Sequence, residues 1–344
     1  MSAPLLSVRD LKVDFRTEDG VVHAVDNVSF DVAPGEVVAV VGESGSGKSV
    51  TAMTLMGLTR SPNAEISGQA TLGDIDLIRA SDEQMRSVRA ERLAMIFQDP
   101  MTSLNPVYRV GDQIVEVLRA HREIEKEEAH DRAVELLRLV GIPAPAERAR
   151  AYPHEFSGGM RQRAMIAMAL ALEPEILIAD EPTTALDVTI QAQILRLLKK
   201  FNEERDLAVI LITHDLGVVA DIADRVLVMY GGRVIENGTL DQIFYDPQHP
   251  YTWGLLGSVM RLDRPRAARL AQIKGQPPSL LNPPQGCHFR PRCPHEFGKC
   301  QEVPGLEARS GESGHLDRCW LNPEQKRNLR VMESGEIGLE APAA

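Results

Sequence analysis

A glycine-rich segment at residues 42–49, Gly-Glu-Ser-Gly-Ser-Gly-Lys-Ser, has the residue types and the spacing of a phosphate-binding loop. An apolar run at residues 36–41 precedes it, as expected of a buried strand, and a helical pattern begins at Lys48. Loop N–H groups and the helix N-terminus together attract anions. We expect a nucleotide phosphate here, with Lys48 at its β- and γ-phosphates and Ser49 binding Mg²⁺. The residues expected to contact the nucleotide are Gly42, Glu43, Ser44, Gly45, Ser46, Gly47, Lys48, Ser49 and Val50.

A second segment has the same anion-binding character but no lysine. Ser157 is a good helix N-cap, Gly158 and Gly159 permit close approach, and an apolar helical run follows at residues 164–172. Because the first loop already serves this chain's own nucleotide, the second is best explained if it closes over the γ-phosphate bound to another subunit. A head-to-tail dimer follows. Taken alone, the segment is better explained as an ordinary serine-capped helix, and only the order of the other motifs favours the nucleotide role.

Two acids end the next apolar run, at residues 175–181. An apolar strand suits a parallel sheet covered on both faces, and its carboxyl end is the edge where ligands bind. Asp180 would hold Mg²⁺ and Glu181 would orient or polarise the attacking water. A further strand at residues 207–213 delivers His214 to the same edge. A lone histidine there is more often a plain loop residue, but its position favours catalysis.

In this order the motifs resemble those of the ATP-binding-cassette (ABC) ATPases, over about residues 6–243. The resemblance implies an α/β P-loop cassette that hydrolyses ATP with Mg²⁺. It gives Gln98 contacts with the metal and the attacking water, and it makes Glu181 and His214 the other catalytic residues. Magnesium would then be held through Ser49, Gln98 and Asp180.

The same resemblance assigns further residues to the nucleotide. Gln162 belongs to the signature that begins at Ser157, and Asp187 is the D-loop aspartate, both serving the opposite subunit's nucleotide. An aromatic residue upstream of the first strand stacks on adenine, and Phe15 is the matching residue. An aromatic side chain at that place could equally belong to the core.

The elements that position these residues form a cassette at residues 5–243. Short strands joined by a turn are expected at residues 5–32, and the resemblance implies that they form an antiparallel edge beside the nucleotide. Apolar spacing predicts helices at 110–121 and 129–140, so a helical subdomain is inserted at residues 98–157. The proline-punctuated loop at residues 98–106 suits docking onto a membrane subunit.

Beyond residue 243 the chain becomes rich in proline and holds all four cysteines, with the spacing C-x5-C-x6-C-x18-C. We expect a small irregular module at residues 244–322 and a flexible tail at 323–344. In the cytosol such thiols stay reduced, which argues against disulfides. The spacing lacks the close pairs of structural zinc sites, so a [4Fe–4S] cluster is favoured, with Zn²⁺ and unligated thiols as alternatives. The ligands would be Cys287, Cys293, Cys300 and Cys319.

Residues 249–252, 273–278 and 286–293 resemble the C-terminal module of the oligopeptide/dipeptide importer ATPases, some of which carry a four-cysteine iron–sulfur cluster there. The resemblance implies the ATPase of a bacterial peptide importer. Its partners would be a similar but distinct second ATPase, giving a heterodimer, two membrane permeases and an extracytoplasmic binding protein. Nickel, glutathione or another small solute remains open as the cargo.

Composition and domain layout exclude several other classes of protein. The net charge of −11 and the pI near 5.4 give no basic footprint, so we expect no nucleic-acid partner. No apolar run approaches the ~18 residues that span a bilayer, and the N-terminus lacks a signal-peptide layout. We therefore expect a peripheral protein on the cytoplasmic face of the membrane. A chromosome-maintenance ATPase would need a long coiled-coil insertion, and a translation-factor ATPase would carry two cassettes.

Overall fold

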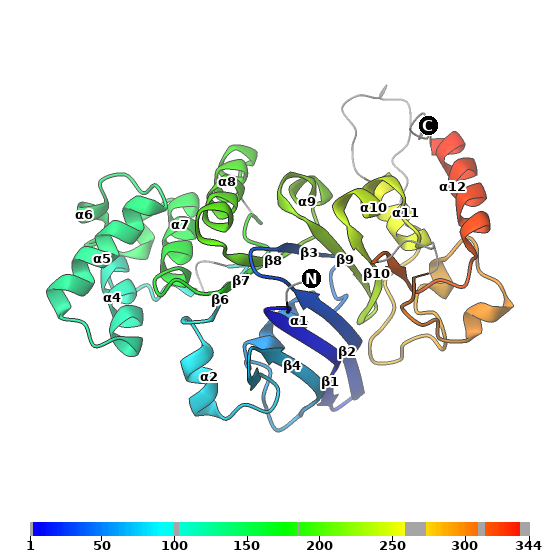
Figure 1. Ribbon diagram of the computed structural model, residues 1–344, viewed down its shortest axis with the longest axis horizontal. Coiled ribbons are helices and arrows are strands. Elements are labelled where there is room, and N and C mark those ends of the chain that lie inside the picture. The colour runs from blue at the N-terminus through cyan, green and yellow to red at the C-terminus, as the bar shows by residue number, and fades with distance from the viewer. Residues whose placement is uncertain (1–2, 100–102, 185, 259–272, 309–313, 338–344) are drawn as a thin grey trace.

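The computed structural model describes residues 3–99, 103–184, 186–258, 273–308 and 314–337. Two sheets form its centre (Figure 1). The smaller sheet is antiparallel, in the order β2-β1-β4-β5, and the larger sheet has the order β11-β10-β9-β3-β8-β7-β6. The smaller sheet's strands are β1 (Leu6–Thr17), β2 (Gly20–Val32), β4 (Ala64–Leu72) and β5 (Ile75–Asp76). The larger sheet's strands are β3 (Val37–Val41), β6 (Leu93–Ile96), β7 (Ile176–Asp180), β8 (Ala208–Thr213), β9 (Arg225–Tyr230), β10 (Arg233–Thr239) and β11 (Leu316–Asp317).

The centre of the larger sheet is parallel because β3, β6, β7, β8 and β9 are joined through crossovers, whereas β10 and β11 run antiparallel at one edge. Strands β3, β7 and β8 are buried along their whole length, which explains their continuous apolar runs. One face packs on the smaller sheet and α1, and the other packs on helices. The α/β cassette with an antiparallel edge is therefore confirmed, although β1 and β2 are long strands rather than short ones.

Helices cover the sheets and build the predicted inserted subdomain, which lies at one end of the molecule (Figure 1). The helix predicted at residues 110–121 is found there, and the second begins three residues earlier than predicted. The helices are α1 (Lys48–Leu55), α2 (Asp82–Val88), α4 (Val110–His121), α5 (Lys126–Leu139), α6 (Pro145–Arg148), α7 (Gly158–Ala169), α8 (Val188–Arg205), α9 (Leu216–Ile222), α10 (Leu240–Tyr245), α11 (Pro250–Gly257) and α12 (Pro323–Ile337), with 3-10 turns η1 (Pro153–Glu155), η2 (Arg290–Arg292) and η3 (Gly298–Gln301).

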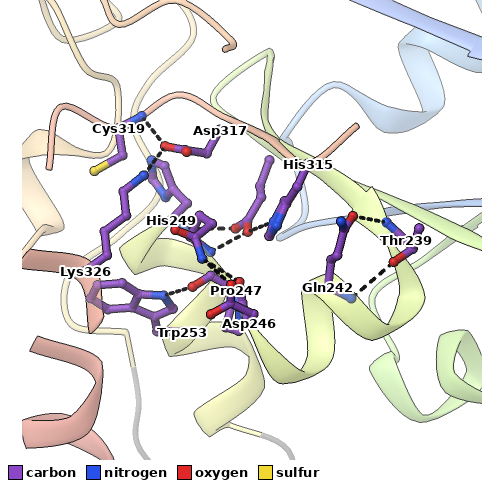
Figure 2. Close-up of polar contacts among 12 residues, drawn as sticks. Thr239, Gln242, Asp246, Pro247, His249, Trp253, His315, Asp317, Cys319 and Lys326 are labelled. Carbon is purple, nitrogen blue, oxygen red and sulfur yellow. Dashed lines mark hydrogen bonds and ion pairs between the residues drawn. The ribbon is translucent and has the colours of Figure 1, made fainter. Parts of the chain in front are cut away.

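The C-terminal module packs at the opposite end and completes the larger sheet through β11, which pairs with β10 (Figure 1). Glu236 of β10 is fully buried and accepts hydrogen bonds from the backbone N–H groups of Gln248 and His249. It also lies 2.9 Å from Nε2 of His315, which directly precedes β11. The module and the cassette therefore share one buried polar network, part of which Figure 2 shows.

The flexible tail predicted from residue 323 is wrong for its first part. Helix α12 begins there, and Lys326 is buried with its ammonium 2.7 Å from Asp317 Oδ1 (Figure 2). The same carboxylate oxygen accepts from the backbone N–H of Cys319. A buried lysine is stable only when it is paired, so this ion pair holds the start of α12 against the module. Residues 338–344 lie outside the described residues.

Candidate functional site

The phosphate loop joins β3 to α1, as the sequence predicts, and its glycines have a steric reason. Gly42 and Gly47 have positive φ angles of 152° and 100°. A Cβ atom at Gly42 would lie 2.2 Å from the carbonyl oxygen of Met229, and one at Gly47 would lie 2.5 Å from that of Ala24. Side chains would therefore collide with backbone, so the loop conformation requires glycine at both positions.

Lys48 folds back over this loop. Its ammonium donates to the carbonyl oxygens of Gly42 at 2.8 Å and Glu43 at 2.9 Å. Burial lowers the pKa of Lys48, and the neighbouring carboxylates oppose that shift. The lysine is thus held at the loop, where its charge can meet a phosphate group.

Ser49 and Asp180 bring two oxygen ligands to the same place. The Ser49 hydroxyl donates to Asp180 Oδ1 at 3.1 Å, which joins the start of α1 to the end of β7. Burial raises the pKa of Asp180, and the hydrogen bond from Ser49 only partly offsets this rise. A hydroxyl and a carboxylate are hard donors that suit Mg²⁺, so the pair fits the ion that the sequence predicts.

Glu181 is the centre of the second half of the site. Its Oε2 accepts from Gln98 Nε2 at 2.9 Å and from the Thr184 hydroxyl at 2.8 Å, while Oε1 lies 3.2 Å from His214 Nδ1. Burial raises the pKa of Glu181, but the hydrogen bonds and the nearby positive groups outweigh it and lower the pKa below its ordinary value. An ionised carboxylate can accept a proton from water. The structure thus brings together the three predicted catalytic residues, and Thr184 is an addition that the sequence did not indicate.

The signature segment starts α7. Ser157 caps this helix by accepting from the N–H of Met160 at 3.3 Å, and Ser157 and Gly158 are exposed. Gln162 differs from the expectation because its side chain is only 2% exposed, so α7 turns it into the protein. Asp187 caps α8 through the N–H groups of two following residues. The N-terminus of α7 is therefore exposed, whereas Gln162 lies buried behind it.

Phe15 on β1 is half-buried and packs against the core between the two sheets. Its predicted contact with adenine stays a prediction. The loop at 98–106 is described only in part, since residues 100–102 lie outside the described residues. Gln113 of α4 holds its second half by hydrogen bonds to Asn105 and Tyr108, and Val107 and Tyr108 are exposed.

The four cysteines lie around one small pocket of the C-terminal module, together with apolar and aromatic side chains. All four are free thiols. Burial raises the pKa of Cys293 and of Cys319 to about 12. In the part of the chain that the structure describes, no group of three or more His, Cys, Asp or Glu side chains is arranged to hold a single metal ion.

The C-terminal module also reaches the phosphate loop, which the sequence did not predict. The Arg292 guanidinium forms a bidentate ion pair with the Glu43 carboxylate, at 2.5 and 3.0 Å. The Glu43 N–H donates to the hydroxyl of Tyr251 at 2.9 Å. Tyr251 and Arg292 lie in residues 249–252 and 286–293, two stretches that resemble the importer ATPases. That resemblance was the only sequence feature that pointed to these two residues.

Comparisons with known proteins agree with this geometry. A family described as "ABC transporter" matches residues 25–184, and "Oligopeptide/dipeptide transporter, C-terminal region" matches residues 235–300. The dipeptide transport ATP-binding protein DppD of Bacillus subtilis is 55% identical over 323 residues, covering 93% of this chain and 96% of its own length. The oligopeptide transport ATP-binding protein OppD of Salmonella typhimurium is 52% identical over 321 residues, covering 93% and 95%.

A solved structure with the same fold is the dimeric ATP-binding cassette MJ0796 in a post-hydrolysis state bound to ADP and Pi. It has a TM-score of 0.62 and 28% sequence identity, and the match covers 68% of this chain and 98% of that one. None of the helices in the described residues is long and apolar enough to cross a membrane.

Proposed function

Because the chain belongs to the ATP-binding proteins of ABC transporters, and among them to the oligopeptide/dipeptide type, we infer that it hydrolyses ATP to drive the import of dipeptides or oligopeptides. The observation that carries this function is the identity of 55% with DppD along nearly the whole chain, C-terminal module included. The residues of the ATP site support hydrolysis, and the match of residues 235–300 to the C-terminal region of oligopeptide/dipeptide transporters supports peptides as the cargo.

Each residue of the site has a proposed task. Lys48 binds the β- and γ-phosphates, while Ser49 and Asp180 hold Mg²⁺, which neutralises phosphate charge when it is bound. Glu181 accepts a proton from the attacking water, and Gln98 and His214 orient its carboxylate. The distances of 2.9 and 3.2 Å from Glu181 to these two side chains support that division of roles.

We propose that two cassettes close around the nucleotide, each ATP lying between one phosphate loop and the opposite signature. The exposed N-terminus of α7, capped by Ser157, supports this arrangement because a helix N-terminus attracts a phosphate. Asp187 and Val188 are exposed at the start of α8 and would meet the partner cassette. The partner would be a second, similar ATPase.

The other proposed partners are two membrane permeases and an extracytoplasmic peptide-binding protein. Val107 and Tyr108 are 72% and 57% exposed directly after the loop at 98–106, which gives a permease an apolar contact at the end of that loop. The chain would then sit on the cytoplasmic face of the membrane through the permeases.

Uptake measurements test this function. A strain that lacks the chain should lose uptake of a labelled dipeptide and of a labelled longer peptide, and the wild-type chain should restore it. A Glu181→Gln chain should not restore it, whereas Glu175→Gln, a change at the other end of β7, should. Normal peptide uptake without the chain would contradict the function, and lost uptake of nickel or glutathione alone would identify a different cargo.

We propose a cysteine-held [4Fe–4S] cluster in the C-terminal module. Its support is that Cys287, Cys293, Cys300 and Cys319, the only cysteines of the sequence, all line one pocket. Four cysteine thiolates are the ligand set that a [4Fe–4S] cluster takes, and the pocket holds four cysteines. Such a cluster would cross-link the loops of the module.

Anaerobic purification tests the cluster. The protein should be brown and carry about four irons per chain, and Cys319→Ser should lose that iron. Glu296→Gln, on the same module but not at a cysteine, is the matched control and should keep it. Stoichiometric zinc with negligible iron would replace the cluster by the alternative metal, and the absence of both would leave four structural thiols.

A further inference from the structure

The C-terminal module contacts the phosphate loop at Glu43. Nη1 and Nη2 of Arg292 each donate to one oxygen of this carboxylate, and the Arg292 side chain is only 5% exposed. A bidentate arginine–carboxylate pair is stronger and more directional than an ordinary hydrogen bond. Arg292 therefore fixes where the Glu43 side chain points.

Arg292 is itself held rigidly. Its guanidinium lies over the ring of Tyr230, 5.7 Å from the centroid, and Nη1 is 3.3 Å from the Tyr230 hydroxyl. Two further donors reach the carbonyl oxygens of Ile273 and Lys274. An arginine with so many partners cannot swing away without losing all of them.

The negative charge of Glu43 explains why an ion pair with Arg292 would favour nucleotide binding. Loop N–H groups and Lys48 make the phosphate loop attractive to anions, but a carboxylate in its second position repels the triphosphate. The ion pair with Arg292 neutralises that charge, and the hydrogen bond from the Glu43 N–H to Tyr251 fixes the backbone of the same residue. Side chain and backbone of Glu43 are thus both held by the module.

We propose that Arg292 is a positioning residue of the ATP site, which compensates the Glu43 charge and so lets the phosphate loop bind the triphosphate. The proposal rests on the ATP site proposed above. It makes the C-terminal module a working part of the nucleotide site. Arg292 ends the 3-10 turn η2 and directly precedes Cys293, so the geometry of the cysteine pocket bears on its position.

A double-mutant cycle on the full chain tests this role, with nucleotide affinity measured by titration of a fluorescent ATP analogue. Arg292→Gln should weaken the affinity about tenfold, because it leaves the Glu43 carboxylate uncompensated beside the phosphates. In a Glu43→Gln chain the same change should cost no more than about threefold, because no freed carboxylate then repels the phosphates and only the attraction of the guanidinium itself is lost. The tenfold loss should also shrink as salt is raised, which a purely structural role would not produce.

Arg290→Gln is the matched control, because Arg290 lies on the same turn but pairs with Glu296 at 3.5 Å. It should keep the wild-type affinity within about twofold. If Arg292→Gln fails to fold in thermal melts, Arg292→Lys replaces it in the cycle and should give an intermediate loss, because it keeps the charge without the fork. An equal loss with and without Glu43, or no loss in a folded chain, would overturn the proposal. A wild-type chain that binds no ATP would instead refute the nucleotide site itself.

Discussion

Replacing Glu181 by glutamine removes the carboxylate that is placed to accept a proton, while the shape of the side chain is kept. Oε2 receives two donors, from Gln98 and Thr184, so the glutamine oxygen should take that position. Its amide nitrogen then faces His214 Nδ1, which in the matching tautomer can accept. The variant should therefore keep the hydrogen bonds of the site and lose only its base.

The size of the effect follows from this geometry. Loss of a general base costs about 10²–10⁴-fold in rate, or about 2.7–5.4 kcal/mol in the barrier. Binding should change little because Lys48 bonds to the loop carbonyl of Gly42 and Ser49 bonds to Asp180, and neither contact involves Glu181. We expect kcat to fall by that factor in the assembled complex while the affinity of the chain for ATP stays within about threefold.

The assay compares ATP turnover in complexes that contain the wild-type chain, Glu181→Gln or Glu175→Gln. The last variant is the matched control, since Glu175 pairs with Arg92 at the far end of β7. The second ATPase of the complex carries an inactivated ATP site, so that it contributes no turnover of its own. If Glu181→Gln keeps near-wild-type turnover with intact binding, Glu181 is not the base and the reasoning fails.

Three further expectations concern other residues. Lys48→Ala should weaken ATP affinity itself, seen by titration of the chain, and unchanged affinity would contradict its place at the phosphates. Gly158→Asp should leave binding by the isolated chain intact but reduce turnover in the complex, because its charge meets the opposite γ-phosphate; equal loss of binding would mean that the segment acts in cis. Asp26→Asn should lower the free energy of unfolding at pH 7 by about 2 kcal/mol, because it leaves the half-buried Arg233 without its partner. Burial raises the pKa of Asp26, but Arg233 outweighs it and lowers the pKa below its ordinary value. The difference should therefore shrink as pH falls below that ordinary value and be lost as pH falls through the lowered one, and a constant gap across this acid range in urea titrations would refute the pairing.

The sequence predicts well what depends on short motifs. The phosphate loop, the acids that end β7 and the helix at 110–121 each combine a local pattern with a boundary signal, and the structure contains all of them. Contacts between distant segments that carry no known motif were not predictable. Arg292 and Glu43 are 249 positions apart, and nothing in either local pattern requires them to meet.

Two smaller differences have the same origin. Lys326 lies in a polar segment, which is why the sequence predicts a flexible tail there. The structure shows that this lysine pairs with the buried Asp317, a contact that the local sequence does not indicate. Gln162 follows the signature glycines, but its burial depends on how α7 packs against the helical subdomain. Strand β11 was not predicted for another reason. It has only two residues, which are too few to show the alternating pattern of a strand.

The late arrival of β11 has a consequence for synthesis on the ribosome. The buried Glu236 of β10 has His315 as a side-chain partner, and His315 lies 79 positions later in the sequence. At translation rates of about 5–20 residues per second, β10 waits roughly 4 to 16 seconds for its neighbour, with an open sheet edge and a carboxylate that lacks this partner. The nascent cassette is thus incomplete until the module has emerged. A chain that ends before β11 should therefore be prone to aggregate, although every motif for hydrolysing ATP has already been made.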